Sequence, residues 1–414
     1  QNAENIEVNV NESIVELKTP LKVKTFDGGK MKDGIATHVY RGKTNKIVRV
    51  KTRSGREVKL TPSHKLFRLN ENLEVMETPS GNLKKGDFIL SPRKIDNNGN
   101  YSLVPLNPNL RVADEDICKR VNTIVEKYVK ENNILKKEFA KLINVNSTTL
   151  RNFSTSNKPT IGFVNELEKI TGIEINISKI KSERQSKSVN IPIVFNEEFA
   201  EFLGYLMSDG MIKGGKSIHF FNKKSSLRDR FSFLVDKLFG VKTKEYYART
   251  VWAVSFNNMV VVEILSDLGF PLKKKSRNIT VPKQLFNASE TVIKSFLKAY
   301  LVCDGHIGKT EVELTTASKS MRNGLSYLLM RLGVLYRVSD RLINGSKYFR
   351  IFISPRESLK IDEYYSKKFY FNSSDIVPMT SAMFKKILGD TKPQELKNEG
   401  ISAISYYKDL NQTA

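Results

Sequence analysis

Two stretches of this chain repeat one pattern, FLGYLMSDG at residues 202–210 and LKAYLVCDG at residues 297–305. In each stretch an apolar segment with helical spacing ends in an aspartate that is followed by glycine. A small residue, Gly204 or Ala299, lies in the middle of each segment, where two helices can approach closely. If the two helices pack side by side, Asp209 and Asp304 come together at their ends.

The two copies stay in step beyond the aspartates. Each is followed by a strand, an amphipathic helix ending in Leu-x-Gly, two more strands, a helix and a lysine-rich loop that reaches Val-Pro. Each copy therefore predicts the order αββαββα. Solenoids need more than two repeats, so we expect a pseudo-twofold pair of halves, at residues 191–285 and 286–378.

Two carboxylates on such an axis form an oxygen-rich site suited to Mg²⁺. A divalent ion held there can activate water and stabilise the leaving oxygen of a phosphodiester. The charge balance points the same way, because 68 Lys and Arg against 44 Asp and Glu give a net charge of +24, which indicates a polyanionic partner. The alternatives are an Asp-Gly pair that only ends a helix, and a lysine-rich thermophile surface. The matched repeat argues against the first, and the low Glu content argues against the second.

Length and composition set the outer limits. A chain of 414 residues suggests two to four domains at about 150 residues each. Its two cysteines make no disulfide framework, and no apolar run reaches the roughly eighteen residues of a membrane span. No secretory signal is visible, so we expect a cytoplasmic protein without a membrane partner.

Residues 1–97 predict an all-β module of short strands. Alternating or β-branched segments are separated by Gly-containing turn signals, with the strands expected at 21–26, 35–40, 46–52 and 57–60. Two polar stretches, 93–110 and 181–190, predict linkers.

The repeated segments resemble the motifs of LAGLIDADG homing endonucleases. The β module resembles the N-terminal part of a Hint (intein) splicing domain, because RSGREVKLTPSHKLF at residues 53–67 is similar to the intein block that carries Thr-x-x-His. Together they resemble an endonuclease-containing intein. ATHVYRG at 36–42 and EFLGY at 201–205 make it most similar to inteins of archaeal V/A-type ATPase catalytic subunits.

The resemblance assigns roles to particular residues. It implies that Asp209 and Asp304 bind Mg²⁺, with Mn²⁺ as a substitute, and are catalytic. It implies a basic catalytic residue in each half. Lys368, within SKKF at residues 366–369, matches the second-half position. In the first half Thr280 stands where the family has lysine, so Lys275 is chosen by internal symmetry. The neighbouring lysines, Lys273, Lys274 and Lys367, are expected to contact DNA phosphates, which is also the alternative role for Lys275. In the splicing module, Thr61 and His64 are implied at the splicing centre, where the histidine assists the first acyl shift.

Residues 110–180 predict a small all-α domain. A short helix at 135–143, a turn at 144–146 and a second helix at 148–153 resemble a repressor-type helix-turn-helix, with a further helix at 161–170. Its second helix would lie in the major groove and present to DNA the side chains Thr148, Thr149, Arg151 and Asn152. A plain helical bundle is the alternative.

The splicing blocks at the two ends are not recognisable. The chain begins with QNA and ends with DLNQTA, without the opening nucleophile or the terminal His-Asn of the family. We expect these 414 residues not to splice. Residues 379–414 form an extension that can return to the Hint module.

The sequence thus predicts a multidomain protein: a Hint-like β module, a helix-turn-helix domain and an α+β endonuclease of two αββαββα halves. Its expected activity is site-specific, Mg²⁺-dependent double-strand cleavage of DNA. The expected partners are a long asymmetric duplex target and host exteins, the latter from an ATPase catalytic subunit. The chain is expected to be a monomer. The alternatives are a DNA-binding protein that has lost cleavage, and a splicing element with a vestigial endonuclease.

Overall fold

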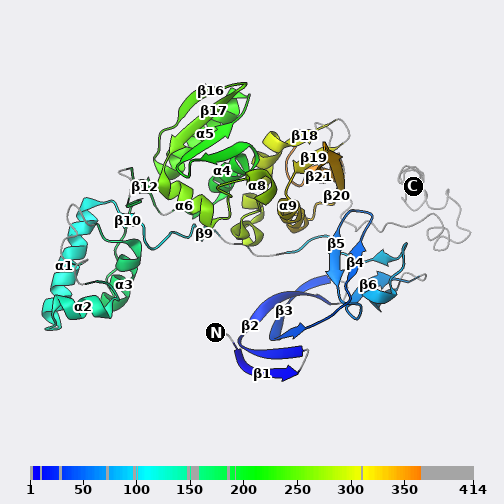
Figure 1. Cartoon of the computed structure of the whole chain (residues 1–414), viewed down its shortest axis with the longest axis horizontal. Coiled ribbons are helices and arrows are strands. Elements are labelled where there is room, and N and C mark those ends of the chain that lie inside the picture. The colour runs from blue at the N-terminus through cyan, green and yellow to red at the C-terminus, as the bar shows by residue number, and fades with distance from the viewer. Residues whose placement is uncertain are drawn as a thin grey trace, which may run out of the picture. The chain divides into compact units, whose positions relative to one another are not determined.

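The structure is a computed structural model. It describes residues 3–9, 12–27, 30–70, 74–96, 99, 101–146, 150, 158–183, 187–191, 193–308 and 311–364. These residues fall into two compact units, one up to Arg93 and one from Lys94 on (Figure 1). Each unit is described by itself.

The first unit is built from antiparallel strands. The long strands β2 (Glu12–Asp27) and β3 (Lys30–Gly42) form a hairpin, with Asp27 opposite Lys30 at the predicted turn, and β1 (Ala3–Asn9) pairs with β2. The other strands are β4 (Val48–Lys51) paired with β5 (Glu57–Leu60), and β6 (Lys65–Leu69) between β7 (Val75–Pro79) and β8 (Phe88–Ile89). A 3₁₀ turn, η1 (Ser80–Asn82), follows β7. All four predicted strands are present, and the first two are parts of longer ones.

The second unit begins with a small helical domain. It contains α1 (Glu115–Glu131), α2 (Lys136–Leu142) and α3 (Ile161–Thr171), which enclose a core of their own. α1 is amphipathic and buries Cys118, Val121, Ile124 and Val125. The expected third helix at 161–170 is thereby confirmed.

The two predicted linkers are not structureless. Residues 93–110 contain β9 (Ser102–Leu103), which pairs with β13 (Val194–Phe195). The other linker overlaps β11 (Lys179–Lys181) and contains β12 (Val189–Asn190), and these strands form a sheet with β10 (Arg111–Val112). The prediction missed these strands because the polar stretch hides two fully buried residues, Val189 within it and Ile180, the register partner of Val189, immediately before it. Their burial requires paired backbone groups, and the short strands provide that pairing.

The rest of the second unit consists of two halves with one topology. The first contains α4 (Glu197–Asp209), β14 (Gly210–Lys213), β15 (Ser217–Phe221), α5 (Ser225–Phe239), β16 (Lys244–Ala248), β17 (Val251–Asn257) and α6 (Met259–Asp267). α7 (Lys275–Asn278) and η3 (Lys283–Asn287) lead to the second half. That half contains α8 (Glu290–Asp304), β18 (Gly305–Ile307), β19 (Val312–Thr316), α9 (Lys319–Arg331), β20 (Arg337–Ile343), β21 (Ser346–Ile353) and α10 (Pro355–Ser358).

Both halves therefore have the predicted order αββαββα. Their sheets also match, in the orders β14-β15-β17-β16 and β18-β19-β21-β20. One large core joins them, and α4 and α8 lie next to each other between the two sheets (Figure 1). Among the described residues, no helix combines the length and apolar character needed to cross a bilayer.

Candidate active site at the ends of two paired helices

α4 and α8 approach each other so closely that no side chain fits between them at Gly204. A Cβ added to Gly204 would lie 2.6 Å from the Cβ of Ala299 and 2.6 Å from the carbonyl oxygen of Phe296. The pair of small residues in the sequence repeat is thus the point where the helices touch. Because the helices are equivalent in the two halves, this contact brings their C-terminal ends together.

Each helix ends at the aspartate and passes directly into a strand. Gly210 and Gly305 have extended backbones, with φ of −90° and −105°, so a left-handed conformation is not the reason for glycine here. The reason is space, since a Cβ would lie 2.5 Å from the carbonyl oxygen of Leu206 in one copy and of Leu301 in the other. Glycine therefore allows the chain to pass close to the last helical turn as the strand begins, and the aspartate lies where the helix ends.

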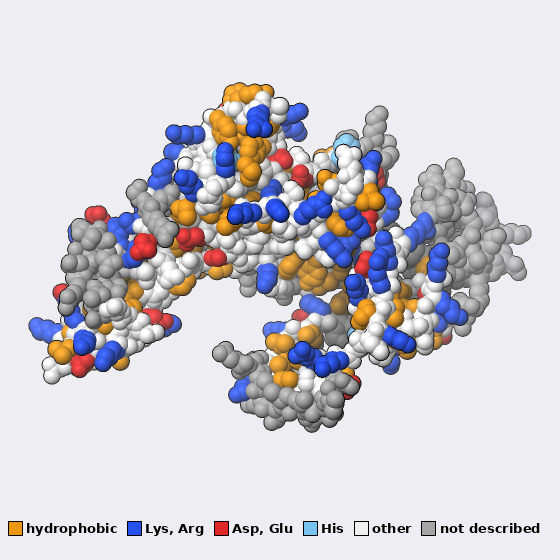
Figure 2. Space-filling model, viewed as in Figure 1, with side chains coloured by type: hydrophobic (Ala, Val, Ile, Leu, Met, Phe, Trp, Pro, Cys, Tyr) orange, Lys and Arg blue, Asp and Glu red, His pale blue; other side chains and the backbone are white. Residues whose placement is uncertain are grey.

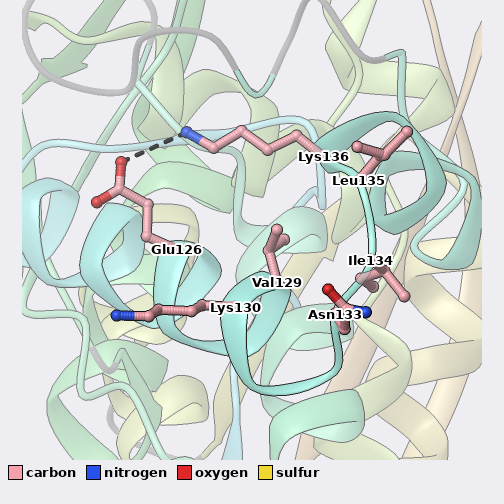
Figure 3. A pocket seen from close by; sticks show the side chains of 7 residues that line it. All are labelled: Glu126, Val129, Lys130, Asn133, Ile134, Leu135 and Lys136. Atoms are coloured by element: carbon pink, nitrogen blue, oxygen red, sulfur yellow. Dashed lines mark hydrogen bonds and ion pairs between the residues drawn. The ribbon is translucent and has the colours of Figure 1, made fainter.

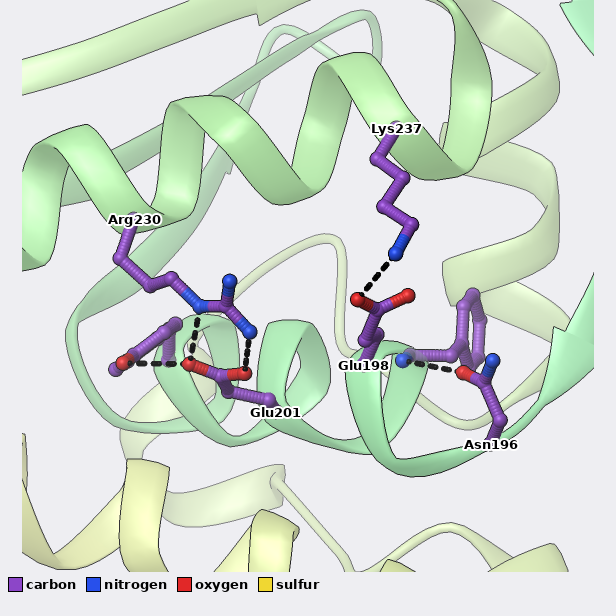
Figure 4. Close-up of polar contacts among 7 residues, drawn as sticks. Asn196, Glu198, Glu201, Arg230 and Lys237 are labelled. Carbon is purple, nitrogen blue, oxygen red and sulfur yellow. Dashed lines mark hydrogen bonds and ion pairs between the residues drawn. The ribbon is translucent and has the colours of Figure 1, made fainter.

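Ion pairs fix α4 against α5 (Figure 4). Arg230 donates two hydrogen bonds to Glu201, at 3.0 and 2.7 Å, and Tyr205 Oη donates to Glu201 at 3.0 Å. One turn earlier, Lys237 Nζ lies 2.6 Å from Glu198. These ion pairs attach α4, the helix that carries Asp209, to α5. The contact at Gly204 attaches the same helix to α8.

Asp209 has a partner that the sequence analysis missed. Asn222 Nδ2 donates to Asp209 Oδ2 at 3.0 Å and lies 3.8 Å from Cys303 Sγ. Asn222 stands two residues past Phe220, the register partner of Gly210. The same position in the second half, two residues past the partner of Gly305, is Thr316. The two halves therefore place different side chains, an amide and a hydroxyl, at this position. The two residues can be matched only when the strand register is known.

The two carboxylates lie in a half-buried environment that resists negative charge. Burial and the negative charge of Asp209 raise the pKa of Asp304 to about 6. Burial also raises the pKa of Asp209, while the hydrogen bond from Asn222 and the charge of Lys275 oppose that rise. Beside them, burial raises the pKa of the Cys303 thiol to about 12, so it is not a ready nucleophile.

Lys275 reaches the same place from the segment between the halves. Its Nζ donates to the carbonyl oxygens of Ser208 and Gly210, the latter at 2.8 Å. Burial lowers the pKa of Lys275 to about 8, against the opposing charges of Asp304 and Asp209. The structure thus brings together three of the predicted site residues, Asp209, Asp304 and Lys275. Lys273 and Lys274 are exposed on the same segment.

Several other predicted residues lie outside the described residues. These are Lys367, Lys368, Thr148, Thr149, Arg151 and Asn152, together with the extension at 379–414. The described part of the expected helix-turn-helix is α2, the turn at 144–146 and residue 150; in the turn Asn144 has φ of 52° and Val145 N donates to the carbonyl of Ala140 at 2.9 Å.

The oxygen atoms at this site suit a hard divalent cation such as Mg²⁺. Carboxylate and backbone carbonyl oxygens are the ligands that Mg²⁺ and Ca²⁺ prefer, and two carboxylates with raised pKa values gain from a nearby cation. Among the described residues, no group of three or more His, Cys, Asp or Glu side chains is arranged to hold a metal ion, so the two carboxylates would be its only acidic side-chain ligands from this part of the chain. A metal here would therefore keep coordination positions for water or substrate.

The sheet faces turned away from the helices carry basic and aromatic side chains. In the first half Lys244, Ser255 and His219 share a face by register, and the ring of His219 bonds Tyr246 Oη at 2.7 Å. In the second half that face carries Arg337, Arg341 and Arg350, and the Arg337 guanidinium lies 4.6 Å from the Phe352 ring centre. Lys and Arg side chains are spread over the visible surface (Figure 2). Such faces suit phosphates and base edges.

In the first unit, Thr61 and His64 belong to one tight turn between β5 and β6. His64 N donates to the carbonyl of Thr61 at 3.0 Å, and Ser80 Oγ donates to the same carbonyl at 2.8 Å. The imidazole is exposed. The predicted pair is thus held together by backbone hydrogen bonds.

The helical domain has a hollow where α1 turns into α2 (Figure 3). Lys136 Nζ lies 3.4 Å from Glu126 across it. It is lined by Glu126, Val129, Lys130, Asn133, Ile134, Leu135 and Lys136. Its one acidic side chain, Glu126, is paired with Lys136.

Comparisons with known proteins match both modules. Residues 1–196 match the family model of the intein splicing domain, and residues 291–362 match that of the LAGLIDADG-like domain. The first match runs through the helical domain, which therefore lies within the matched region.

The chain is also similar to archaeal proteins. An A-type ATP synthase subunit of Pyrococcus abyssi is 31% identical over 412 residues, which is 98% of this chain and 33% of that protein. The replication factor C small subunit of Methanocaldococcus jannaschii is 27% identical over 353 residues, 84% of this chain and 14% of that protein. The chain thus spans a third or less of the length of these two relatives.

Two solved structures complete the comparison. The TvoVMA intein is 35% identical, with a TM-score of 0.21, over 22% of this chain and 52% of that one. Variants of the homing endonuclease I-DmoI are 16% identical, with a TM-score of 0.33, over 40% of this chain and 93% of theirs. Since the two family matches fall on residues 1–196 and on the second of the paired halves, the chain belongs to the inteins that contain a LAGLIDADG endonuclease domain, and it is similar to an archaeal A-type ATP synthase subunit.

Proposed function

We propose that this protein is a site-specific DNA endonuclease that makes a double-strand break with the help of Mg²⁺, or of Mn²⁺ in its place. The observation that carries the proposal is the pair Asp209 and Asp304 at the adjoining ends of α4 and α8, with Lys275 beside them. Two half-buried carboxylates with raised pKa values are costly for a fold and are typical of a functional site.

Asp209 and Asp304 would hold the metal. When bound, the ion supplies an activated water and neutralises the charge on the leaving oxygen. Asn222 orients the Asp209 carboxylate through its hydrogen bond. Lys275, and Lys368 in the second half, would stabilise the negative charge that develops on the phosphate.

The DNA would be a long asymmetric duplex. The two sheet faces carry different side chains, so they would read different half-sites, and a single chain would suffice as a monomer with two halves. Lys273, Lys274 and Lys367 would contact phosphates. The helical domain would add contacts through Thr148, Thr149, Arg151 and Asn152 in the manner of a helix-turn-helix.

The β module would belong to a splicing centre, with His64 polarising the upstream peptide bond and Thr61 beside it. Its exteins would be those of an ATPase catalytic subunit, in keeping with the similarity to the A-type ATP synthase of Pyrococcus abyssi. The protein would act in the cytoplasm, where a host gene without the intein is the natural target.

The test is cleavage of a plasmid that carries such a host gene without the intein, with Mg²⁺ and with chelator. Wild type should linearise the plasmid only with Mg²⁺, while Asp209→Asn and Asp304→Asn should bind the same DNA without double-strand cleavage. Asp229→Asn, an exposed position on α5, is the control. Normal cleavage by either active-site variant would contradict the proposed site. Binding without cleavage by wild type would favour a DNA-binding protein with a vestigial endonuclease.

A further inference from the structure

The lysine at the site is bonded to the backbone rather than to a carboxylate. Lys275 Nζ donates to the carbonyl oxygens of Ser208 and Gly210, the residues on either side of Asp209. Ser208 lies in the last turn of α4, where carbonyl oxygens lack helical partners and the helix end is electronegative. The Lys275 ammonium therefore occupies carbonyl oxygens that would also attract a metal ion bound to Asp209.

The segment that carries Lys275 is held on the second half. Arg277 Nη2 donates to Ser346 Oγ at 2.9 Å, and Ser318 Oγ donates to the carbonyl of Ile279 at 2.6 Å. Lys274, immediately before Lys275, has φ of 50°, a left-handed conformation that is unfavourable for a non-glycine residue. The chain thus accepts local strain at the point where it directs Lys275 toward the carbonyls.

The surroundings contain a negative charge that needs an opposing cation. Asp209 and Asp304 both favour a positive charge at Lys275, while burial disfavours it. An ammonium and a divalent ion near the same two carboxylates would repel each other through a medium of low effective dielectric. The presence of the ammonium should therefore lower the affinity of the site for the divalent ion, and the divalent ion should weaken the binding of the ammonium.

We propose that Lys275 is a built-in counter-cation, which occupies the carbonyls beside Asp209 until a divalent ion binds and displaces it. This inference rests on the proposed function, because it takes Asp209 and Asp304 as the metal site. Displacement frees the ammonium from the backbone, so that it becomes available to the phosphate only after the metal is bound. It also frees the start of α7, whose Ile279 N donates to the carbonyl of Lys275 at 2.9 Å.

The experiment measures Mn²⁺ binding by calorimetry on the full chain without DNA. Lys275→Met should bind Mn²⁺ about 10-fold more tightly than wild type, because the competitor is gone. Lys274→Met and Lys273→Met remove the same charge from exposed neighbours and should change the affinity less than about 2-fold. Lys275→Gln keeps a donor without the charge and should lie between Lys275→Met and wild type. It also serves as the readout if Lys275→Met does not fold.

A second measurement follows the α7 segment. Hydrogen exchange of the Ile279 amide should accelerate when Mn²⁺ is added to wild type. Equal affinity in Lys275→Met and the two controls, or weaker binding in Lys275→Met, would overturn the inference and leave the metal site intact. If wild type, Lys275→Gln and Lys275→Met all fail to bind Mn²⁺, the metal site itself is wrong and the proposed function fails with it.

Discussion

Gly204 of the first repeat and Ala299 of the second face each other, and any side chain larger than hydrogen at position 204 would overlap the partner helix. The carboxylates lie at the ends of these same helices. The contact that brings Asp209 and Asp304 together is therefore a packing contact buried in the core.

Gly204→Ala should force α4 and α8 apart and lower stability by roughly 1–3 kcal/mol, the usual cost of overpacking a core. Denaturation followed through Trp252, the one tryptophan of the chain, measures this in the second unit. Gly204→Ala combined with Ala299→Gly should recover part of the loss, because the Phe296 carbonyl still lies 2.6 Å from the new methyl group. An unchanged denaturation curve for the single variant would mean that the helices do not meet here.

The metal-free protein should lose stability as the pH rises through about 6. The pKa of Asp304 in the folded protein lies above its ordinary value of 3.8, so the folded state binds this proton more tightly than the unfolded chain does. The resulting stabilisation is fully present below 3.8 and is lost by about pH 7, with a magnitude on the order of 3 kcal/mol. Denaturation in chelator across this range checks it, and Asp304→Asn should flatten the profile. A profile unchanged by Asp304→Asn would refute the raised pKa, and Asp229→Asn is the charge-matched control.

Glu201→Ala should destabilise the first half more than Glu198→Ala. Glu201 accepts from Arg230 twice and from the half-buried hydroxyl of Tyr205, which would lose its acceptor. We expect a loss of about 1–2 kcal/mol for Glu201→Ala and less than about 1 kcal/mol for Glu198→Ala, which pairs with the exposed Lys237. Trp252 fluorescence during denaturation measures both. Equal losses would show that the Tyr205 contact contributes nothing.

The helical domain can be removed where its two ends meet, at Asp114 and Ser178. Ser178 N donates to Asp114 Oδ2 at 3.0 Å, so a short linker from Asp114 to Ser178 replaces residues 115–177 and keeps β10 and β11. This variant should bind DNA more weakly and with a shallower dependence on salt, because phosphate contacts are lost. Single-turnover cleavage at saturating enzyme should persist, since Asp209 and Asp304 remain. An unchanged affinity and salt slope would favour the plain helical bundle.

Features that follow from residue spacing along the chain could be predicted from the sequence. Contacts that depend on how two strands pair could not. The repeated motif predicted the helix pair, the Gly204–Ala299 contact and the order of elements in both halves, because apolar spacing and an internal repeat are visible in one dimension. Lys275 followed from symmetry alone, and its amine lies against the carbonyls on either side of Asp209. Asn222 was missed because its place beside Asp209 depends on which residue of β15 pairs with Gly210. β12 was missed because a buried Val189 in a polar stretch gives no periodic signal.

The covalent joining of the halves has a consequence for how this molecule can change over generations. In a symmetric dimer, one codon alters both copies of a side chain at once, so each substitution must be tolerated twice. Here Asn222 beside Asp209 and Thr316 at the matching place in the second half are encoded separately. One half can therefore acquire a new residue while the other keeps the old one, and the arginines of one sheet face can be gained or lost without touching the other. One codon change in this chain thus alters one side chain of the paired site, where in a symmetric dimer it would alter two.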